Sequence, residues 1–291
     1  MSKRMCDFVG CGRLGRTIAK LWAQHNSVTL STIVTRQLET AQQAVQFIGA
    51  GSANTSLADL SGDLICIASG DDTIDTIVSD LTAQCDFAPG TIVMHFSGSL
   101  PATILAPLRA KGCLIASVHP LRGFADPELS VQNFAGTFCT LEGDAEALAI
   151  LQPLFEQIGG RCLTINSADK AAYHAASSFA GNFILSLADI AMRMFQDSGM
   201  TAADGYAVTH SLMHTVLQNF RGPDLQGVLT GPISRGDFGT VAKHVQAIQE
   251  SDYAEPYRAL ASSTMHLANL SAEQRAQLTQ LLSQLEVPNV H

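Results

Sequence analysis

Charged side chains are scarce in this sequence, and basic ones are the scarcer kind. They make up 15% of the 291 residues, against an average of about 25% in globular proteins. There are 17 Lys and Arg against 26 Asp and Glu, which gives a formal net charge of −9. Because nucleic-acid backbones are bound by clustered basic side chains, we expect no nucleic-acid partner. The low charge also predicts that another subunit covers part of the surface.

Long apolar runs and secretion signals are also missing. The most apolar long stretch, residues 179–195, contains Asn182, Asp189 and Arg193, so we expect no membrane span. The first residues lead directly into a glycine motif, without an apolar signal region or a cleavage site. These absences favour a cytoplasmic protein.

The cysteines form no recognisable framework. There are seven, an odd number, and no two are separated by two residues as in a redox or zinc motif. Most lie in apolar runs typical of strands, such as residues 64–67. We therefore expect buried thiols in a reducing compartment.

Two kinds of pattern divide the chain near residue 166. In the first part, helix-length segments separate short β-rich runs, and this alternation predicts a parallel sheet with helices on both faces. The expected strands are 5–9, 28–34, 64–68, 91–96, 113–118, 134–141 and 161–165, and the expected helices are 13–24, 38–48, 72–83, 102–111 and 144–158. Only helical patterns follow, over 168–198, 202–220, 240–249, 255–267 and 272–284. We predict an α/β protein with a Rossmann-type doubly wound domain over 1–166 and an all-α domain over 167–291.

A glycine-rich turn follows the first expected strand and opens an amphipathic helix. It reads Gly10-Cys11-Gly12-Arg13-Leu14-Gly15. In this context the first glycine allows a tight turn, the second lets the backbone approach a pyrophosphate, and the third permits close helix–strand packing. The helix N-terminus adds free N–H groups. The motif predicts a dinucleotide site formed by these six residues.

The end of the second strand favours NADP over NAD. An acidic residue would bind the ribose of NAD there, but the sequence has Thr35 and Arg36, which suit a 2′-phosphate. Ala68 and Ser69 end the next long strand, where they would lie over the centre of the cofactor. Asp72 follows as a plausible helix N-cap.

Three segments should converge where a nicotinamide would lie. Two follow neighbouring strands and carry Ser97 and His119, and the third is the first helix of the second domain. On that helix Lys170, Tyr173, His174 and Ser177 share one face. Lysine and histidine are natural proton donors to a carbonyl that is being reduced. Ser97 could either donate to a substrate oxygen or cap the turn that follows it.

Two further segments leave alternatives open. Arg235 could clamp a substrate carboxylate, or it could form a structural pair or helix cap with Asp237. His210 and His214 are spaced for a shared metal, but no third ligand is evident, so we expect no metal site.

These residues together resemble a family of uncharacterised bacterial proteins. Its members have a Rossmann-like NADP domain followed by a helical domain of unknown function, within the 6-phosphogluconate dehydrogenase-like superfamily. The matching stretches are residues 10–15, 96–98, 117–121, 170–176 with Asn182, 229–232 and 235–237. Relatives include ketopantoate reductase, 3-hydroxyisobutyrate dehydrogenase, pyrroline-5-carboxylate reductase and prephenate dehydrogenase.

The resemblance implies a helical domain that forms homodimers and a variant reaction site. Lys170 matches the lysine of the hydroxyacid branch, but His174 occupies its asparagine position. In 6-phosphogluconate dehydrogenase a histidine stands where this chain has Tyr173. Ser97 and His119 look like the Ser and His-Pro of prephenate dehydrogenases.

We therefore expect an NADP-dependent oxidoreductase that acts on a small keto or hydroxy carboxylic acid. Lys170 would exchange the proton, tuned by His174 and Tyr173, and Ser97 and His119 would orient the substrate oxygen. The substrate itself would be bound by Arg235, Asn182 and Asp237, with Arg235 coming from the same or the partner subunit. The alternative is a non-catalytic NADP-binding sensor or scaffold with the same cradle.

Overall fold

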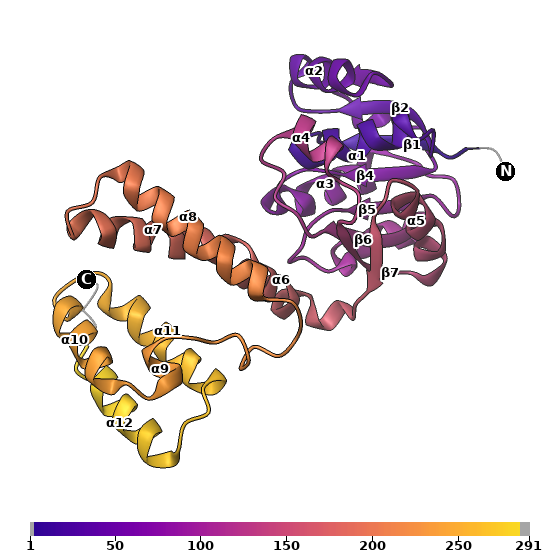
Figure 1. Cartoon of the computed structure of the whole chain (residues 1–291). Helices are drawn as coiled ribbons and strands as arrows, with labels where there is room; N and C mark the ends of the chain where they lie inside the picture. Colours follow the sequence, from indigo (N-terminus) through magenta and orange to yellow (C-terminus); the bar gives the residue numbers. More distant parts are fainter. Residues whose placement is uncertain (1–2, 286–291) are drawn as a thin grey trace. The chain divides into compact units, whose positions relative to one another are not determined.

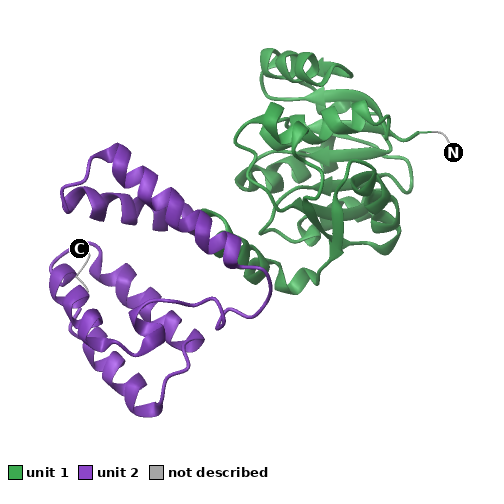
Figure 2. Cartoon of the chain, in the orientation of Figure 1, with its two compact units in different colours: residues 1–182 green, residues 183–291 purple. Residues whose placement is uncertain are grey.

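The computed structural model describes residues 3–285 and divides the chain into two compact units. One comprises Met1–Asn182 and the other Phe183–His291, drawn in green and purple in Figure 2.

The first unit is built on one eight-stranded sheet with the order β3-β2-β1-β4-β5-β6-β7-β8 (Figure 1). The strands are β1 (Met5–Val9), β2 (Thr29–Val34), β3 (Ser52–Asn54), β4 (Leu64–Ile67), β5 (Ile92–His95), β6 (Leu114–Pro120), β7 (Phe138–Gly143) and β8 (Arg161–Thr164). All neighbours pair in parallel except β6 and β7. The strand order 3-2-1-4-5-6 is that of a Rossmann domain, which confirms the predicted fold class.

Helices cover both faces of this sheet, as the alternating pattern predicted. They are α1 (Arg13–Gln24), α2 (Leu38–Ile48), α3 (Asp71–Gln84), η2 (Ala102–Lys111), α4 (Pro127–Gln132) and α5 (Ala145–Gln157). Alternate residues of β4 point to opposite cores: Cys66 packs with α1 and α5, and Ile65 packs with α3 and η2. Because both faces of the sheet are covered, the sequences of its central strands are continuous apolar runs.

Local structure differs from the sequence prediction at three places. The segment 102–111 is a 3₁₀ helix with Pro107 inside it, because proline lacks the N–H that an α-helix needs there. β7 begins at Phe138 and not at Phe134, since a turn bonds the N–H of Thr137 to the Phe134 carbonyl. Three short elements were not predicted: β3, α4 and the 3₁₀ turn η1 (Leu57–Asp59).

The helix predicted over 168–198 is broken in two. A 3₁₀ turn, η3 (Ser167–Asp169), leads into α6 (Lys170–Ala180), and α7 (Asn182–Asp197) follows after Gly181. Gly181 has φ −126° and ψ −82°, outside the helical region, so the chain changes direction there. As a result α6 belongs to the first compact unit and α7 to the second.

The second unit is all helical within the described residues. It contains α7, α8 (Ala202–Asn219), α9 (Pro232–Arg235), α10 (Phe238–Ile248), α11 (Ala254–Leu267) and α12 (Ala272–Leu282). Its core joins α10, α11 and α12, with Met194 of α7 packed against it. Ser271 and Gln274 form a capping box at the start of α12.

One stretch meets the length and hydropathy criteria for a membrane span. It runs from Ser167 to Asp197, and none of its most apolar window is buried. Core helices and subunit interfaces of water-soluble proteins can satisfy the same criteria, so this is weak support for a span.

Candidate active site

A cleft of about 1560 Å³ lies along the carboxyl ends of the parallel strands. The loops that follow β1, β2, β4, β5 and β6 line it, together with α6. All of these elements belong to the first compact unit. Ligands of doubly wound sheets bind in this position.

The three motif glycines occupy the positions that their predicted roles require. Gly10 has φ +77°, and a Cβ there would lie 2.9 Å from the carbonyl oxygen of Ala68. A Cβ on Gly15 would lie 2.8 Å from the Ala68 Cβ, so helix α1 packs closely against the end of β4. A Cβ on Gly12 would meet nothing within 4 Å. Gly12 therefore opens onto the cleft, as a backbone that approaches a phosphate must.

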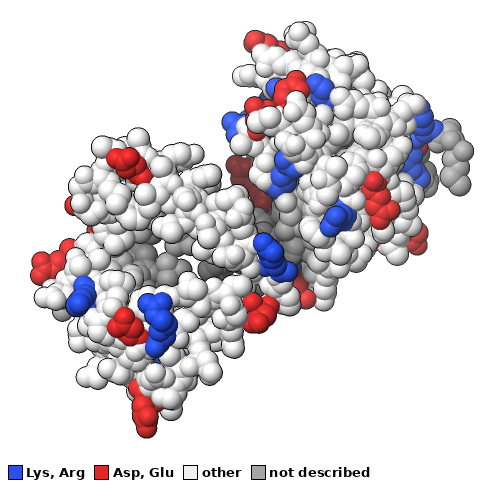
Figure 3. Space-filling view, viewed as in Figure 1, with Lys and Arg blue, Asp and Glu red and all other residues white. Residues whose placement is uncertain are grey.

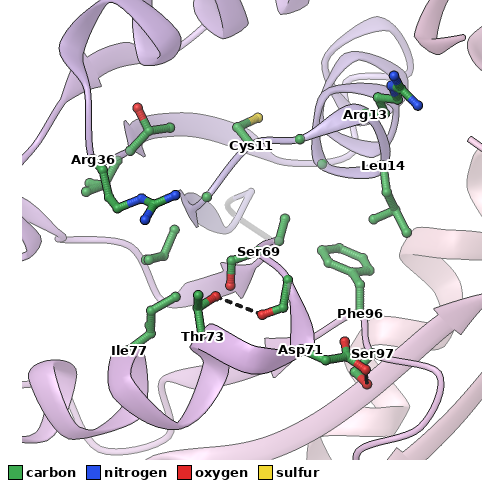
Figure 4. A pocket seen from close by; sticks show the side chains of 18 of the residues that line it. Cys11, Arg13, Leu14, Arg36, Ser69, Asp71, Thr73, Ile77, Phe96 and Ser97 are labelled. Atoms are coloured by element: carbon green, nitrogen blue, oxygen red, sulfur yellow. Dashed lines mark hydrogen bonds between the residues drawn. The ribbon is translucent and has the colours of Figure 1, made fainter. Parts of the chain in front are cut away.

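The rest of the loop is held in place by groups that sequence reasoning missed. The Nε–H of Arg16 donates to the carbonyl oxygen of Cys11 at 3.1 Å. Burial raises the pKa of the Cys11 thiol to about 12, so this sulfur is a neutral packing group. Leu14 and the exposed Arg13 also line the cleft (Figure 4).

The loops after β2 and β4 hold the other residues predicted to contact the cofactor. Arg36 is exposed, makes no polar contact within the described residues and points into the cleft (Figure 4). The Thr35 hydroxyl donates to the Gln37 carbonyl at 2.7 Å. The Ser69 hydroxyl is buried and has no hydrogen-bond partner. Asp72 is not the N-cap that we predicted, because Gly70 takes that place and Asp72 lies in the first turn of α3.

These features fit a phosphate-bearing dinucleotide. Gly12 precedes α1 without any side-chain cap, which leaves first-turn N–H groups for an anion. Arg36 offers an unpaired guanidinium, and Ser69 offers a buried hydroxyl that lacks a partner. Together they supply donors for phosphate and ribose oxygens along one wall of the cleft.

At the other end of the cleft, two imidazoles meet at a glycine. A Cβ on Gly98 would lie 2.5 Å from Cδ2 of His174 and 2.8 Å from Cε1 of His119. The two histidine rings are 5.9 Å apart between centroids. His119 ends β6, and His174 comes from α6. The structure thus joins two of the predicted reaction-site segments at a third, the turn after β5.

A hydrogen-bond chain fixes the orientation of His119. The Thr140 hydroxyl donates to the Tyr173 hydroxyl at 2.8 Å, and the Tyr173 oxygen lies 2.9 Å from Nδ1 of His119. With its oxygen accepting from Thr140, Tyr173 has its proton free to donate to Nδ1. His119 then carries its own proton on Nε2, the nitrogen beside Gly98.

Burial keeps this imidazole uncharged. Burial first, and then the neighbouring His174 and Lys170, lower the pKa of His119 to about 4. Burial also raises the pKa of the Tyr173 hydroxyl. At neutral pH the pair is therefore a neutral phenol donating to a neutral imidazole.

Ser97 caps its own turn, one of the two roles predicted for it. Its hydroxyl donates to Asp71 at 2.7 Å and accepts from the Leu100 N–H at 2.9 Å. Ser99 donates to the same carboxylate oxygen at 2.7 Å. Asp71, which sequence reasoning did not select, thus anchors the turn that carries Gly98.

Lys170 lies in a buried ion pair behind the turn. Its ammonium is 3.0 Å from Oε1 of Glu142 and also donates to Ser117, and the lysine and glutamate side chains are each 2% exposed. Ser117 of β6 and Glu142 of β7 are register partners. Burial lowers the pKa of Lys170, and the hydrogen bond that its ammonium donates to Glu142 opposes that shift. Lys170 does not line the cleft.

The remaining predicted residues lie at or beyond the boundary between the units. Asn182 is exposed at the start of α7, and Arg235 is exposed at the end of α9. Asp237 is the N-cap of α10, where it accepts from the N–H and the hydroxyl of Thr240. His210 and His214 stack on α8, and the described residues contain no cluster of three metal-ligating side chains.

Comparison with known proteins agrees with this architecture. Residues 3–120 match the model of a Rossmann-like domain, and residues 137–264 match that of a domain of unknown function, DUF2520. No curated protein matches the chain.

Solved structures share the fold over most of the chain. A protein from Thermotoga maritima is 24% identical, with 94% of this chain and 98% of that chain covered and a TM-score of 0.69. A Bacteroides fragilis protein described as an NADP oxidoreductase is 17% identical, with 91% and 98% covered and a TM-score of 0.71. A pyrroline-5-carboxylate reductase from Coxiella burnetii is 14% identical, with 98% and 100% covered and a TM-score of 0.60.

The sheet order and the glycine loop define a protein with a Rossmann-type nucleotide-binding fold. More particularly, the chain joins a segment that matches a Rossmann-like domain to a segment that matches a DUF2520 domain. This pair of domains confirms the resemblance, stated from the sequence motifs, to proteins with a Rossmann-like domain followed by a domain of unknown function.

Proposed function

We propose that the protein is an NADP-dependent oxidoreductase that reduces a small keto carboxylic acid or oxidises the corresponding hydroxy acid. One observation carries the proposal: a single cleft runs from the glycine loop to the two imidazoles at Gly98. Hydride transfer to a carbonyl requires a dinucleotide-binding loop, a hydrogen-bond donor to the carbonyl oxygen and a proton-exchanging group in one cleft.

The chain's own residues would orient the substrate oxygen and move its proton. Nicotinamide, when bound, supplies or accepts the hydride. The neutral His119 presents its Nε2–H as a fixed donor that polarises a carbonyl oxygen without changing charge. His174 lines the cleft beside it, has no hydrogen-bond partner on its ring within the described residues, and is the group that exchanges the proton.

Lys170 then has a positioning role in place of the proton-exchange role inferred from the sequence. Its ammonium is already bound by Glu142 and Ser117, and its side chain is absent from the cleft lining. Glu142 also accepts from the Ala102 N–H at 2.6 Å and from Ser167. The ion pair therefore ties the start of α6, which carries Tyr173 and His174, to the sheet.

NADP is favoured over NAD by the free guanidinium of Arg36 and by the lack of a carboxylate at the end of β2. A guanidinium binds a phosphate through two parallel hydrogen bonds and gains little from an unphosphorylated ribose. Arg36→Gln should therefore weaken NADPH binding at least tenfold and leave NADH binding within about twofold.

The experiment that tests the function is NADPH oxidation followed by absorbance, across a panel of small keto and aldehyde acids that includes ketopantoate and succinic semialdehyde. Wild-type protein should turn over one of them, and His174→Ala should lose turnover while retaining its affinity for NADPH. Tight NADPH binding without turnover on any compound would overturn the proposal and favour a non-catalytic sensor.

A further inference from the structure

One arginine in the cleft has a guanidinium whose hydrogen-bond donors are only partly satisfied. Arg122 lies two residues after β6, half-buried, and lines the same cleft as His119 and His174. Its Nη1 donates to the carbonyl oxygen of Asn133, the C-cap of α4. Its Nε is buried and has no hydrogen-bond partner, and nothing in the described residues accepts from Nη2.

The backbone around Arg122 is fixed, so this position is not an accident of a loose loop. The Arg122 N–H donates to the Pro120 carbonyl at 2.9 Å, and the Leu121 N–H donates to Phe138 of β7 at 2.8 Å. These bonds join the loop to the strand that carries His119. The backbone of Arg122 is thus fixed by these bonds, and its guanidinium is fixed by the bond to Asn133.

A buried N–H without an acceptor is costly, by about 1–3 kcal/mol. Native proteins keep such groups where a ligand, an ion or a water completes them. Asn133 occupies the Nη1 end of the guanidinium, which leaves the edge formed by Nε–H and Nη2–H. That edge presents two parallel donors, the arrangement that matches the two oxygens of a carboxylate.

We propose that Arg122 binds the carboxylate of the substrate, and so makes the substrate a 2-keto acid, or another small compound whose carboxylate lies next to the reacting carbon. This inference rests on the proposed function, because it places the anion in the cleft that His119 and His174 line. It assigns to the first compact unit the carboxylate-binding role that the sequence had suggested for Arg235.

The test uses oxalate and oxamate, which resemble a 2-keto acid but cannot be reduced. Calorimetric titration into the NADPH-saturated full-length protein should give binding that Arg122→Gln weakens at least tenfold. Arg122→Lys keeps the charge but loses the paired donors, so its affinity for the probes should lie between those of wild type and Arg122→Gln. Arg161→Gln removes the same charge at the start of β8, outside the cleft lining, and should bind both probes as wild type does.

The outcomes distinguish a substrate carboxylate from a cofactor phosphate as the anion that Arg122 binds. If Arg122→Gln weakens NADPH binding tenfold and leaves oxalate binding unchanged, the group that Arg122 holds is a cofactor phosphate, and the proposal is wrong. If neither affinity changes, or if wild type binds neither probe, the proposal is also wrong. Binding of both probes that depends on Arg122, in a protein without turnover on any keto acid, would support the carboxylate site and overturn the oxidoreductase function.

Discussion

At the scale of single residues, the site depends on polar groups whose charge is suppressed by burial. His119 and His95 both have their pKa lowered to about 4, in each case mainly by burial. Neutral imidazoles hold a defined tautomer, because one nitrogen must donate and the other must accept. Such groups give directional hydrogen bonds at the cost of stability in acid.

The hydroxyl of Tyr173 should matter through His119 and not through direct contact with the substrate. Tyr173→Phe removes the donor to Nδ1, so Nε2–H is no longer fixed toward Gly98. A lost hydrogen bond of about 1 kcal/mol corresponds to a roughly fivefold to tenfold fall in kcat. The measurement is the pH profile of NADPH oxidation. Because the Tyr173 donor favours the neutral form of His119, its loss should raise the pH at which His119 becomes protonated. The activity of the variant should therefore begin to fall at a higher pH than that of wild type.

The matched control for Tyr173→Phe is Ser178→Ala. It removes a hydroxyl from the same helix that bonds only the His174 carbonyl at 3.3 Å. This variant should keep the wild-type kcat and pH profile. Equal losses in the two variants would mean that the Tyr173 effect comes from general damage to α6.

His95 should make the protein lose stability in acid. Its Nδ1 accepts from the Ser97 N–H at 3.1 Å, and its Nε2 lies 3.3 Å from the Pro101 carbonyl. The pKa of the His95 imidazole is 6.5 in the unfolded chain and about 4 in the folded protein. Above pH 6.5 the imidazole is neutral in both states. As the pH falls toward 4, the unfolded chain binds the proton first, and stability is lost.

Denaturant unfolding at pH 7 and pH 4.5 measures this linkage. His95→Asn keeps an acceptor near Nδ1 but cannot titrate, so it should lose about 2 kcal/mol less stability between the two pH values than wild type loses. His266→Asn, at an exposed position on α11, should behave as wild type. Identical losses in wild type and His95→Asn would contradict the assigned pKa.

At the scale of elements, the β1–α1 loop separates a binding glycine from a structural one. Gly12→Ala adds a methyl group to open space at ordinary backbone angles, so the fold should persist while NADPH affinity falls more than tenfold. Gly15→Val drives a side chain into Ala68, so the protein should melt well below wild type. NADPH fluorescence titration and thermal melting distinguish the two effects. Unchanged NADPH affinity in Gly12→Ala would show that the loop does not approach a phosphate.

Much of the Rossmann domain could be predicted because its signals are local. Apolar runs bounded by turn residues indicated the strands, and a glycine at each constrained position indicated the loop. Ser97, His119 and His174 were likewise selected as candidates from their places at strand ends and on one helix face, and the structure brings them to one end of the cleft. Each of these inferences needs only a few neighbouring residues.

The partners of those residues could not be predicted because they depend on pairing between distant segments. Glu142 meets Lys170 only because β7 runs antiparallel to β6 and places Glu142 opposite Ser117. Asp71 reaches Ser97 from the start of α3, the helix between β4 and β5, 26 residues earlier in the chain. The break at Gly181 was also missed, since an apolar helical period continues on both sides of it.

At the scale of the whole molecule, the second unit exposes an apolar surface that a monomer would leave in water. Leu185 of α7 is 73% exposed and Val216 of α8 is 66% exposed. Other exposed apolar side chains on these two helices are Phe183, Leu187, Tyr206, Leu212 and Leu217. Figure 3 shows how few charged side chains interrupt the visible surface. Exposed apolar patches of this kind mark association sites.

A second copy of the chain is the partner that we propose for this surface. A bilayer is the other candidate, because the stretch from Ser167 to Asp197 is long and apolar enough to span one. That stretch carries an ion pair, however, between Asp189 and Arg193 at 3.0 Å, and ionised groups are expensive inside a bilayer. An interface between two identical surfaces would bury the leucines and leave this pair at its polar rim.

Light scattering after size exclusion should therefore give twice the chain mass of 30.9 kDa. Leu185→Asp places a charge on the most exposed leucine of α7 and should shift the protein to monomer. Leu38→Asp makes the same change at a 47% exposed position on α2, in the other unit, and should leave the dimer intact. A monomeric wild-type protein that sediments with phospholipid vesicles would instead assign the apolar stretch to a membrane, because a bilayer would then be what covers it.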